Sequence, residues 1–248
     1  MAHTIVLPNE FENEGINFLP PRPNQRGGQS VLVNYTPPSA SERGGAFILQ
    51  TCRVRIPFGI DQSRPENGSA IKYHISISMA NDETQNQQLR EFTSNIRAID
   101  EKAKEYSQEN EEWFGKKLST ELVKEFYKSA EKFPKDPKWP STLKIKLPFD
   151  RHNKPQFFLY DEDKKPISIL DSDGNINPDS IPKGCEAVCL IQSTGVWFVG
   201  KTQYGVGYKL LQAKIYKSNK LIGYSIVDSE PEEEEEEEEE KEEKDDVE

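Results

Sequence analysis

Lysine and arginine occur at alternating positions in segments whose remaining positions are apolar. Lys144 and Lys146 alternate with apolar residues in 142–149, and Arg53 and Arg55 do so in 46–58. A period of two places the cations on one face of a strand and the apolar side chains on the other. Cations can hold phosphates and aromatic rings can stack on unpaired bases, so the pattern favours a surface for single-stranded nucleic acid. The candidate residues are Arg53, Arg55, Lys144, Lys146, Trp197, Phe198, Lys201, Tyr204, Tyr208, Lys209 and Lys214.

A purely structural explanation of the same residues stays open. Aromatic residues on strands often belong to the core, and alternating cations often form an ordinary solvated face. Segments 186–200 and 206–217 carry apolar residues at both parities, so their facing is undetermined. A shift of one residue would exchange core and binding surface there.

Other motifs favour turns and strands over catalysis. Residues 195–202, GVWFVGKT, match the phosphate-loop pattern, but Val-Trp-Phe-Val favours a strand and no helix signal follows. Residues 171–179 alternate Asp and Asn but lack the glycine and glutamate of an EF-hand. Cys185, Cys189 and the remote Cys52, with three histidines in the chain, do not form a zinc set. We therefore expect no enzyme, no cofactor and no metal site.

Negative charge is concentrated at the C-terminus. Residues 231–248 hold 14 of the 43 acidic and two of the 32 basic residues, which leaves 29 acidic and 30 basic residues in 1–230. A run of nine glutamates favours disorder. The tail could simply aid solubility, or it could compete with nucleic acid for the cationic surface and bind basic partners. The residues that represent this partner-binding tail are Glu232, Glu236, Glu240, Asp245 and Asp246.

The predicted elements give the chain a mainly β organisation. Residues 1–40 are expected to form an irregular arm that buries little, apart from a short strand at 29–35. Strands at 46–58 and 70–79 precede a helical insertion at about 82–133, and further strands follow at 142–149, 186–200 and 206–217. This order predicts an OB-fold-like barrel in a domain of residues 41–228, followed by a disordered acidic tail at 229–248. A β-sandwich stays open as an alternative.

Within the insertion, an apolar stripe with helical spacing runs from Leu89 to Tyr106, after a cap at Asn81 or Asp82. A second helix is expected over 118–133, with Ser119 in its capping pattern. An odd, sparse set of cysteines, no apolar run of about 20 residues and no signal-like start favour a soluble intracellular protein.

The stretch from about Pro140 to Tyr216 resembles the single-stranded DNA-binding proteins of nucleocytoplasmic large DNA viruses. The segments concerned are STLKIKLPFD, QFFLYDEDKKPI, IPKGCEAVCLIQSTGVWFVGKTQYGVGYKLLQAKIY and the acidic end. Those viral proteins are in turn similar to acidic-tailed single-stranded DNA-binding proteins of some tailed phages. The resemblance implies an OB-fold barrel that coats DNA in viral replication, recombination or repair, and a tail that recruits replication proteins.

Several points stay open after this resemblance. The protein could act at the site of viral replication in the host cell or be packaged in the virion, prefer DNA or RNA, and form a homodimer. The competing hypothesis is a structural or scaffolding virion component, or a chaperone-like protein, that binds basic partners through its tail.

Overall fold

The computed structural model describes residues 5–23, 28–38, 44–64, 71–81 and 83–216. Contacts divide the chain into two units, Met1–Ser218 and Asn219–Glu248, and every described residue belongs to the first. The expected acidic tail and the expected boundary at 228/229 therefore lie outside the described residues.

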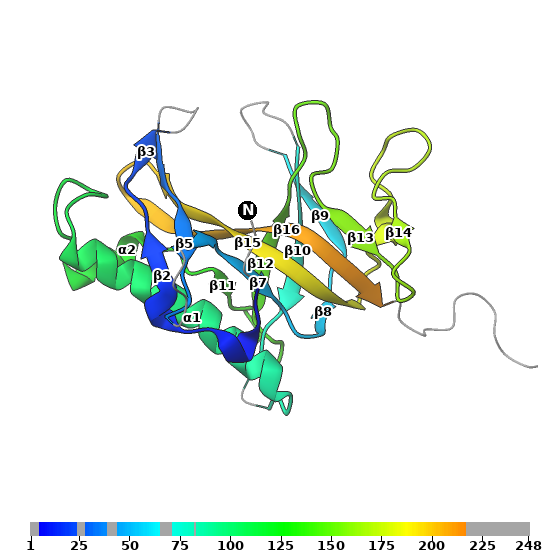
Figure 1. Cartoon of the computed structure of the whole chain (residues 1–248), viewed down its shortest axis with the longest axis horizontal. Coiled ribbons are helices and arrows are strands. Elements are labelled where there is room, and N and C mark those ends of the chain that lie inside the picture. Colours follow the sequence, from blue (N-terminus) through cyan, green and yellow to red (C-terminus); the bar gives the residue numbers. More distant parts are fainter. Residues whose placement is uncertain (1–4, 24–27, 39–43, 65–70, 82, 217–248) are drawn as a thin grey trace, which may run out of the picture. The chain divides into compact units, whose positions relative to one another are not determined.

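A β-barrel is the centre of the first unit, in which β7, β8 and β9 form one bent segment beside β10, β12, β15 and β16 (Figure 1). Strands β7 and β8 pair antiparallel with β15, β15 pairs with β16, β16 pairs in parallel with β12, and β12 pairs with β10, which pairs with β9. Only residues 57–59 separate β8 from β9, so one bent segment closes the ring. The strands are β7 (Ile48–Gln50), β8 (Val54–Ile56), β9 (Ile60–Ser63), β10 (Lys72–Ser78), β12 (Thr142–Leu147), β15 (Cys185–Val199) and β16 (Gln203–Tyr216).

This arrangement confirms the predicted mainly β fold with a helical insertion, in an OB-fold-like barrel. The alternation predicted in 46–58 holds only from Cys52 to Ile56, where Arg53 and Arg55 are exposed between buried residues. Before it, Phe47, Leu49 and Thr51 are buried although they share the parity of the arginines. After it, Phe58 is 57% exposed. The chain turns at this point, where Gly59 has a φ of +67°, and the ring leaves the inward face.

The helical insertion consists of α1 (Gln87–Glu109) and α2 (Thr120–Phe126). The predicted stripe of α1 is confirmed, since Phe92, Ile96, Ile99 and Ala103 are fully buried. The helix begins later than the expected cap at Asn81 or Asp82: the side chain of Asn86 accepts a hydrogen bond from the Leu89 N–H.

Helix α2 has the predicted cap, Ser119, but it ends at Phe126 rather than at residue 133. The backbone of Tyr127 forms a bridge with Tyr204, and the Lys128 N–H donates to the Tyr204 carbonyl over 2.8 Å. These contacts to β16 replace the next helical turn. The chain then forms β11 (Glu131–Lys132), which pairs with β12.

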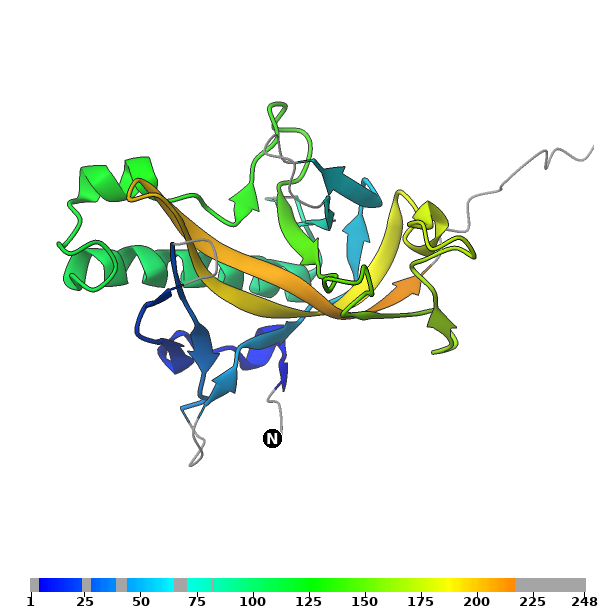
Figure 2. The same ribbon diagram turned by 90° about the horizontal axis from the view of Figure 1, so that it is seen from above.

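The N-terminal region corrects the expectation of an irregular arm that buries little. Strand β1 pairs in parallel with β7, and β4 pairs with β15. Figure 2 shows these strands (blue) on one side of the long β15–β16 hairpin and β10 and β12 on its other side. Val6, Val31 and Tyr35 are buried. Val31, Val33 and Tyr35 alternate within the strand predicted at 29–35, so the sequence carried a period of two there. Val6 lies in a run of only three apolar residues, Ile5–Leu7, which is too short to show a period.

The elements of this region are β1 (Ile5–Val6), η1 (Pro8–Glu10), η2 (Asn13–Gly15), β2 (Ile16–Phe18), β3 (Arg22–Pro23), β4 (Gln29–Val31), β5 (Val33–Tyr35) and β6 (Gly45–Ala46). Farther along the chain, β13 (Phe158–Tyr160) pairs with β16 and with β14 (Pro166–Ile167), and η3 spans Pro178–Ser180.

Two β-bulges determine the facing of the β15–β16 hairpin. Ser193 pairs with Tyr208 and Gly195 with Gly207, so Thr194 is an extra residue in β15; in the same way Leu211 is extra in β16. Beyond each extra residue, the side chains that point into the barrel stand at odd positions if they stood at even positions before it, and the reverse. In β16 the buried positions change from Tyr204, Val206, Tyr208 and Leu210 to Ala213 and Ile215.

Candidate nucleic-acid interface

A groove lined by five lysines runs over the outer face of the barrel strands. We call it the lysine groove; its cavity volume is about 330 Å³. The lysines come from β10, from the segment after α2, and from β12. Its lining includes Lys72, Lys128, Lys132, Lys144, Lys146, Tyr73, His74, Trp197 and Tyr208. Within the described part of the chain, no Asp or Glu lines it.

Strand register explains why these cations converge. His74 of β10 lies opposite Lys146 of β12, and Lys146 lies opposite Lys209 of β16. Ser76 lies opposite Lys144 in the same ladder. Because these residues alternate with the buried Ile75 and Ile145, they share the outer face of the sheet.

The charges in the groove act on one another. Burial lowers the pKa of Lys144 and the charge of Lys132 lowers it further, against the opposing effect of Asp61. Burial also lowers the pKa of His74, and Lys144 adds to that shift. Like charges held this close are stabilised by an anionic ligand, so the groove favours a polyanion such as a phosphate backbone.

One acid lies beside the groove and offsets part of its charge. Asp61 of β9 approaches His74, with Oδ2 at 2.9 Å from Nε2. The Asp61 side chain is 62% exposed whereas that of His74 is 7% exposed. The carboxylate is therefore hydrated at the rim, and the histidine fills the space beneath it.

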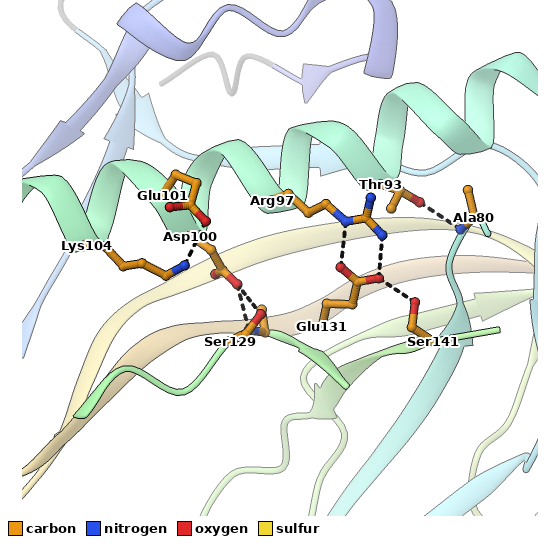
Figure 3. Close-up of polar contacts among 10 residues, drawn as sticks. Ala80, Thr93, Arg97, Asp100, Glu101, Lys104, Ser129, Glu131 and Ser141 are labelled. Atoms are coloured by element: carbon orange, nitrogen blue, oxygen red, sulfur yellow. Dashed lines mark hydrogen bonds and ion pairs between the residues drawn. The ribbon is translucent and has the colours of Figure 1, made fainter. Parts of the chain in front are cut away.

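Helix α1 fixes the segment that carries Lys128 and Lys132 (Figure 3). The carboxylate of Asp100 accepts hydrogen bonds from the Tyr127 hydroxyl, the Ser129 hydroxyl and the Ala130 N–H, over 2.7, 2.7 and 2.9 Å. Burial raises the pKa of Asp100, although these three hydrogen bonds act to lower it.

One turn away on α1, Arg97 forms two hydrogen bonds with the carboxylate of Glu131, over 2.7 and 2.9 Å. Ser141, which precedes β12, donates to the same carboxylate. Burial tends to raise the pKa of Glu131, but the hydrogen bonds from Arg97 and Ser141 and the charge of Arg97 outweigh it and lower the pKa. Glu131 thus joins the helix to both segments that carry groove lysines.

Three of the sequence-predicted residues line the groove with open side chains: Lys144, Lys146 and Trp197. Lys144 and Lys146 are exposed and Trp197 is half-buried. A Cβ at Gly205 would come within 3.0 Å of the indole, so the ring of Trp197 lies against the bare backbone of β16. Lys209, half-buried, joins this group as the cross-strand neighbour of Lys146.

Four predicted cations lie elsewhere. The guanidinium of Arg53 pairs with Glu186 at 2.6 Å and lies 4.1 Å from the ring centroid of Tyr216, which Lys214 also approaches. These two cations belong to a separate cluster on β15 and β16. Arg55 lines a different pocket, and Lys201 lies exposed in the β15–β16 turn at a third cavity.

The burial of Tyr204 and Tyr208 corrects the expectation that they stack on bases. They are 0% and 3% exposed, because they share the inward parity of β16 before its bulge. The Tyr204 hydroxyl bonds to Ser107 over 2.6 Å, and Phe198 is half-buried with its ring stacked on that of Tyr204. Tyr208 forms part of the groove floor and exposes little of its ring.

Sequence reasoning missed Lys72, Lys128 and Lys132 as groove residues. Lys72 shares the polar parity of the strand at 70–79, and that signal was sufficient to find it. Lys128 and Lys132 fall within the helix predicted over 118–133. The binding residues were predicted from the faces of predicted strands, so they did not include these two lysines. Only the contacts of Tyr127 and Lys128 with β16 reveal their position.

Among the described residues, no group of three or more His, Cys, Asp or Glu side chains could hold a metal ion. Cys52, Cys185 and Cys189 are free and buried, and burial raises the pKa of Cys52 and Cys185 to about 11. Neither of the helices in the described ranges is long and apolar enough to cross a membrane.

No protein-family model matches the sequence, and no curated protein matches it significantly. Among solved structures, the chain is similar to gp2.5, a single-stranded DNA-binding protein encoded by bacteriophage T7, with 12% identity and a TM-score of 0.44 over 74% of this chain and 92% of that chain. It is also similar to the single-stranded DNA-binding protein from bacteriophage Enc34 in complex with ssDNA, with 15% identity and a TM-score of 0.45 over 84% of this chain and 99% of that chain. Values this low establish no family for the chain.

Proposed function

We propose that this chain binds single-stranded DNA without sequence preference and that the lysine groove holds the phosphate backbone. The observation that carries the proposal is the convergence of five lysines on one groove whose described lining contains no acid. Phosphate contacts of this kind give affinity without sequence information. The half-buried indole of Trp197 adds an aromatic surface within the groove.

The proposed biological role and the proposed role of the tail rest on the sequence. The resemblance of residues 140–216 to viral single-stranded DNA-binding proteins supports a role in viral DNA replication, recombination or repair. The acidic residues of 231–248 support a tail that competes with DNA for the groove and recruits basic replication partners.

The test is fluorescence anisotropy of labelled oligo-dT over a salt series, with the full chain and the double variant K144A/K146A. We expect the variant to bind all oligonucleotides more weakly. The slope of log K against log salt should also fall, by about 0.7 for each phosphate that the variant no longer neutralises. The matched control is K116A/K117A, which removes the same charge from exposed positions between α1 and α2.

Two outcomes would contradict the proposal. If the full chain and its tail-truncated form both fail to bind at low salt, the scaffolding hypothesis takes its place. If K144A/K146A and K116A/K117A weaken binding equally, net charge rather than the lysine groove determines affinity.

A further inference from the structure

A second pocket, with a volume of about 530 Å³, carries three exposed aromatic rings. Phe58 lies at the bend between β8 and β9, and Phe133 and Trp139 lie in the connection from β11 to β12. We call this site the aromatic pocket. The rings are 57%, 72% and 62% exposed, which places them among the most exposed large apolar side chains of the described residues.

The three rings do not pack against one another. None of the ring contacts found in the described part of the chain joins any two of Phe58, Phe133 and Trp139. Three prolines, Pro57, Pro134 and Pro140, flank them in the pocket lining and restrict the backbone that carries the rings. Aromatic groups held in water at this exposure usually mark a contact surface.

Cations surround the rings, which distinguishes this pocket from an ordinary apolar docking site. Arg55 and Lys132 belong to the pocket lining. The Nζ of Lys138 lies 5.6 Å from the ring centroid of Trp139, and the same ammonium forms an ion pair with Asp136 at 3.0 Å. The ligand that fits is therefore flat, able to stack and attached to negative charge.

The aromatic pocket is continuous with the lysine groove. Lys132 lines both, and it lies opposite Thr142, another residue of the pocket lining. Along β12 the two sites follow one another, with Lys144 and Lys146 in the groove and Thr142 in the pocket. A strand whose phosphates occupy the groove would reach the pocket directly.

We propose that the aromatic pocket is a base-stacking site, in which Phe133, Trp139 and Phe58 receive unpaired bases of a single strand whose phosphates occupy the lysine groove. This inference rests on the proposed function. It assigns stacking to residues outside the barrel strands, whereas Tyr204 and Tyr208 are enclosed in the core. Stacking on these rings discriminates a strand with bases from a bare phosphate backbone.

The experiment compares two ligands of equal length and charge, oligo-dT and an abasic oligomer, on the full chain. We expect the full chain to prefer oligo-dT, and the double variant F133A/W139A to reduce that preference by about 5- to 150-fold for each base that no longer stacks. The salt slope should be unchanged, because the variant keeps every groove lysine. Tryptophan fluorescence should be quenched by oligo-dT, and W139F should lose the part of the quenching that comes from Trp139, while Trp197 in the lysine groove keeps its own part.

The matched control is F158A, which removes an equally exposed ring, 63%, on β13 and outside the pocket. If F133A/W139A and F158A bind oligo-dT like the unaltered chain, with quenching undiminished in W139F, the stacking site is refuted while groove binding stands. If neither ligand binds the full chain, the proposed function itself fails.

Discussion

Glu131 is the buried acid that joins α1 to the segment carrying Lys132 and Phe133. Its side chain is 2% exposed and accepts from Arg97 and Ser141. Glu131→Gln removes the charge and leaves the Arg97 guanidinium with a weaker acceptor. At pH 7 we expect a loss of about 1–3 kcal/mol in the free energy of unfolding, measured by urea denaturation.

The pH dependence of this loss has a definite sign. Because the folded-state pKa of Glu131 is lowered from 4.5, its contribution to stability is complete above 4.5 and is lost as the pH falls through the folded-state pKa. The difference between E131Q and the unaltered chain should therefore shrink below pH 4.5. A difference that stays constant through this range would show that the charge of Glu131 does not matter.

Glu101 provides the control on the same helix. It pairs with Lys104 at 2.7 Å, but its side chain is 63% exposed. Exposed ion pairs contribute little, so Glu101→Gln should change the free energy of unfolding by less than about 0.5 kcal/mol.

At the scale of the element, the bulge at Thr194 determines how β15 meets the N-terminal strands. Gly195 has a φ of +92°, and a Cβ there would overlap the carbonyl oxygen of Val31 in β4. We expect Gly195→Ala to lower the free energy of unfolding by roughly 2 kcal/mol or more, because β4 must move or the strand must lose its bulge. Chemical denaturation measures the effect.

Gly200 separates backbone conformation from crowding. It also has a positive φ, +58°, but a Cβ there would meet nothing within 4 Å. Gly200→Ala should cost only about 1 kcal/mol. Equal losses for the two variants would mean that the contact with β4 contributes nothing.

The sequence predicted the regular strands well, but it could not predict the facing of strands with a bulge or the role of residues in connections. The pattern in 142–149 has a period of two, and it predicted that Lys144 and Lys146 are exposed while Leu143, Ile145 and Leu147 are buried, as the structure has them. In β15 and β16 the extra residues Thr194 and Leu211 reverse the parity, so no single period describes either strand. The aromatic pocket was missed because Phe133 and Trp139 lie in a connection, where periodicity carries no information.

At the scale of the whole molecule, charge is divided sharply along the chain. The formal net charge is −11, yet 1–230 holds 29 acidic and 30 basic residues, so the lysine groove is a local feature of a nearly neutral body. A long strand of phosphates and a run of nine glutamates are both polyanions. In the proposed function the two compete for the groove, and salt would screen the attraction of both.

We therefore expect truncation after Glu230 to tighten binding to oligo-dT at low salt, as measured by anisotropy. The ratio of the affinity of the truncated chain to that of the full chain should approach one as salt rises, because the competition is electrostatic. Replacing the nine glutamates by glutamine keeps the length of the tail and should reproduce the gain if charge is the cause. Equal affinities of the full and truncated chains at low salt would exclude competition by the tail.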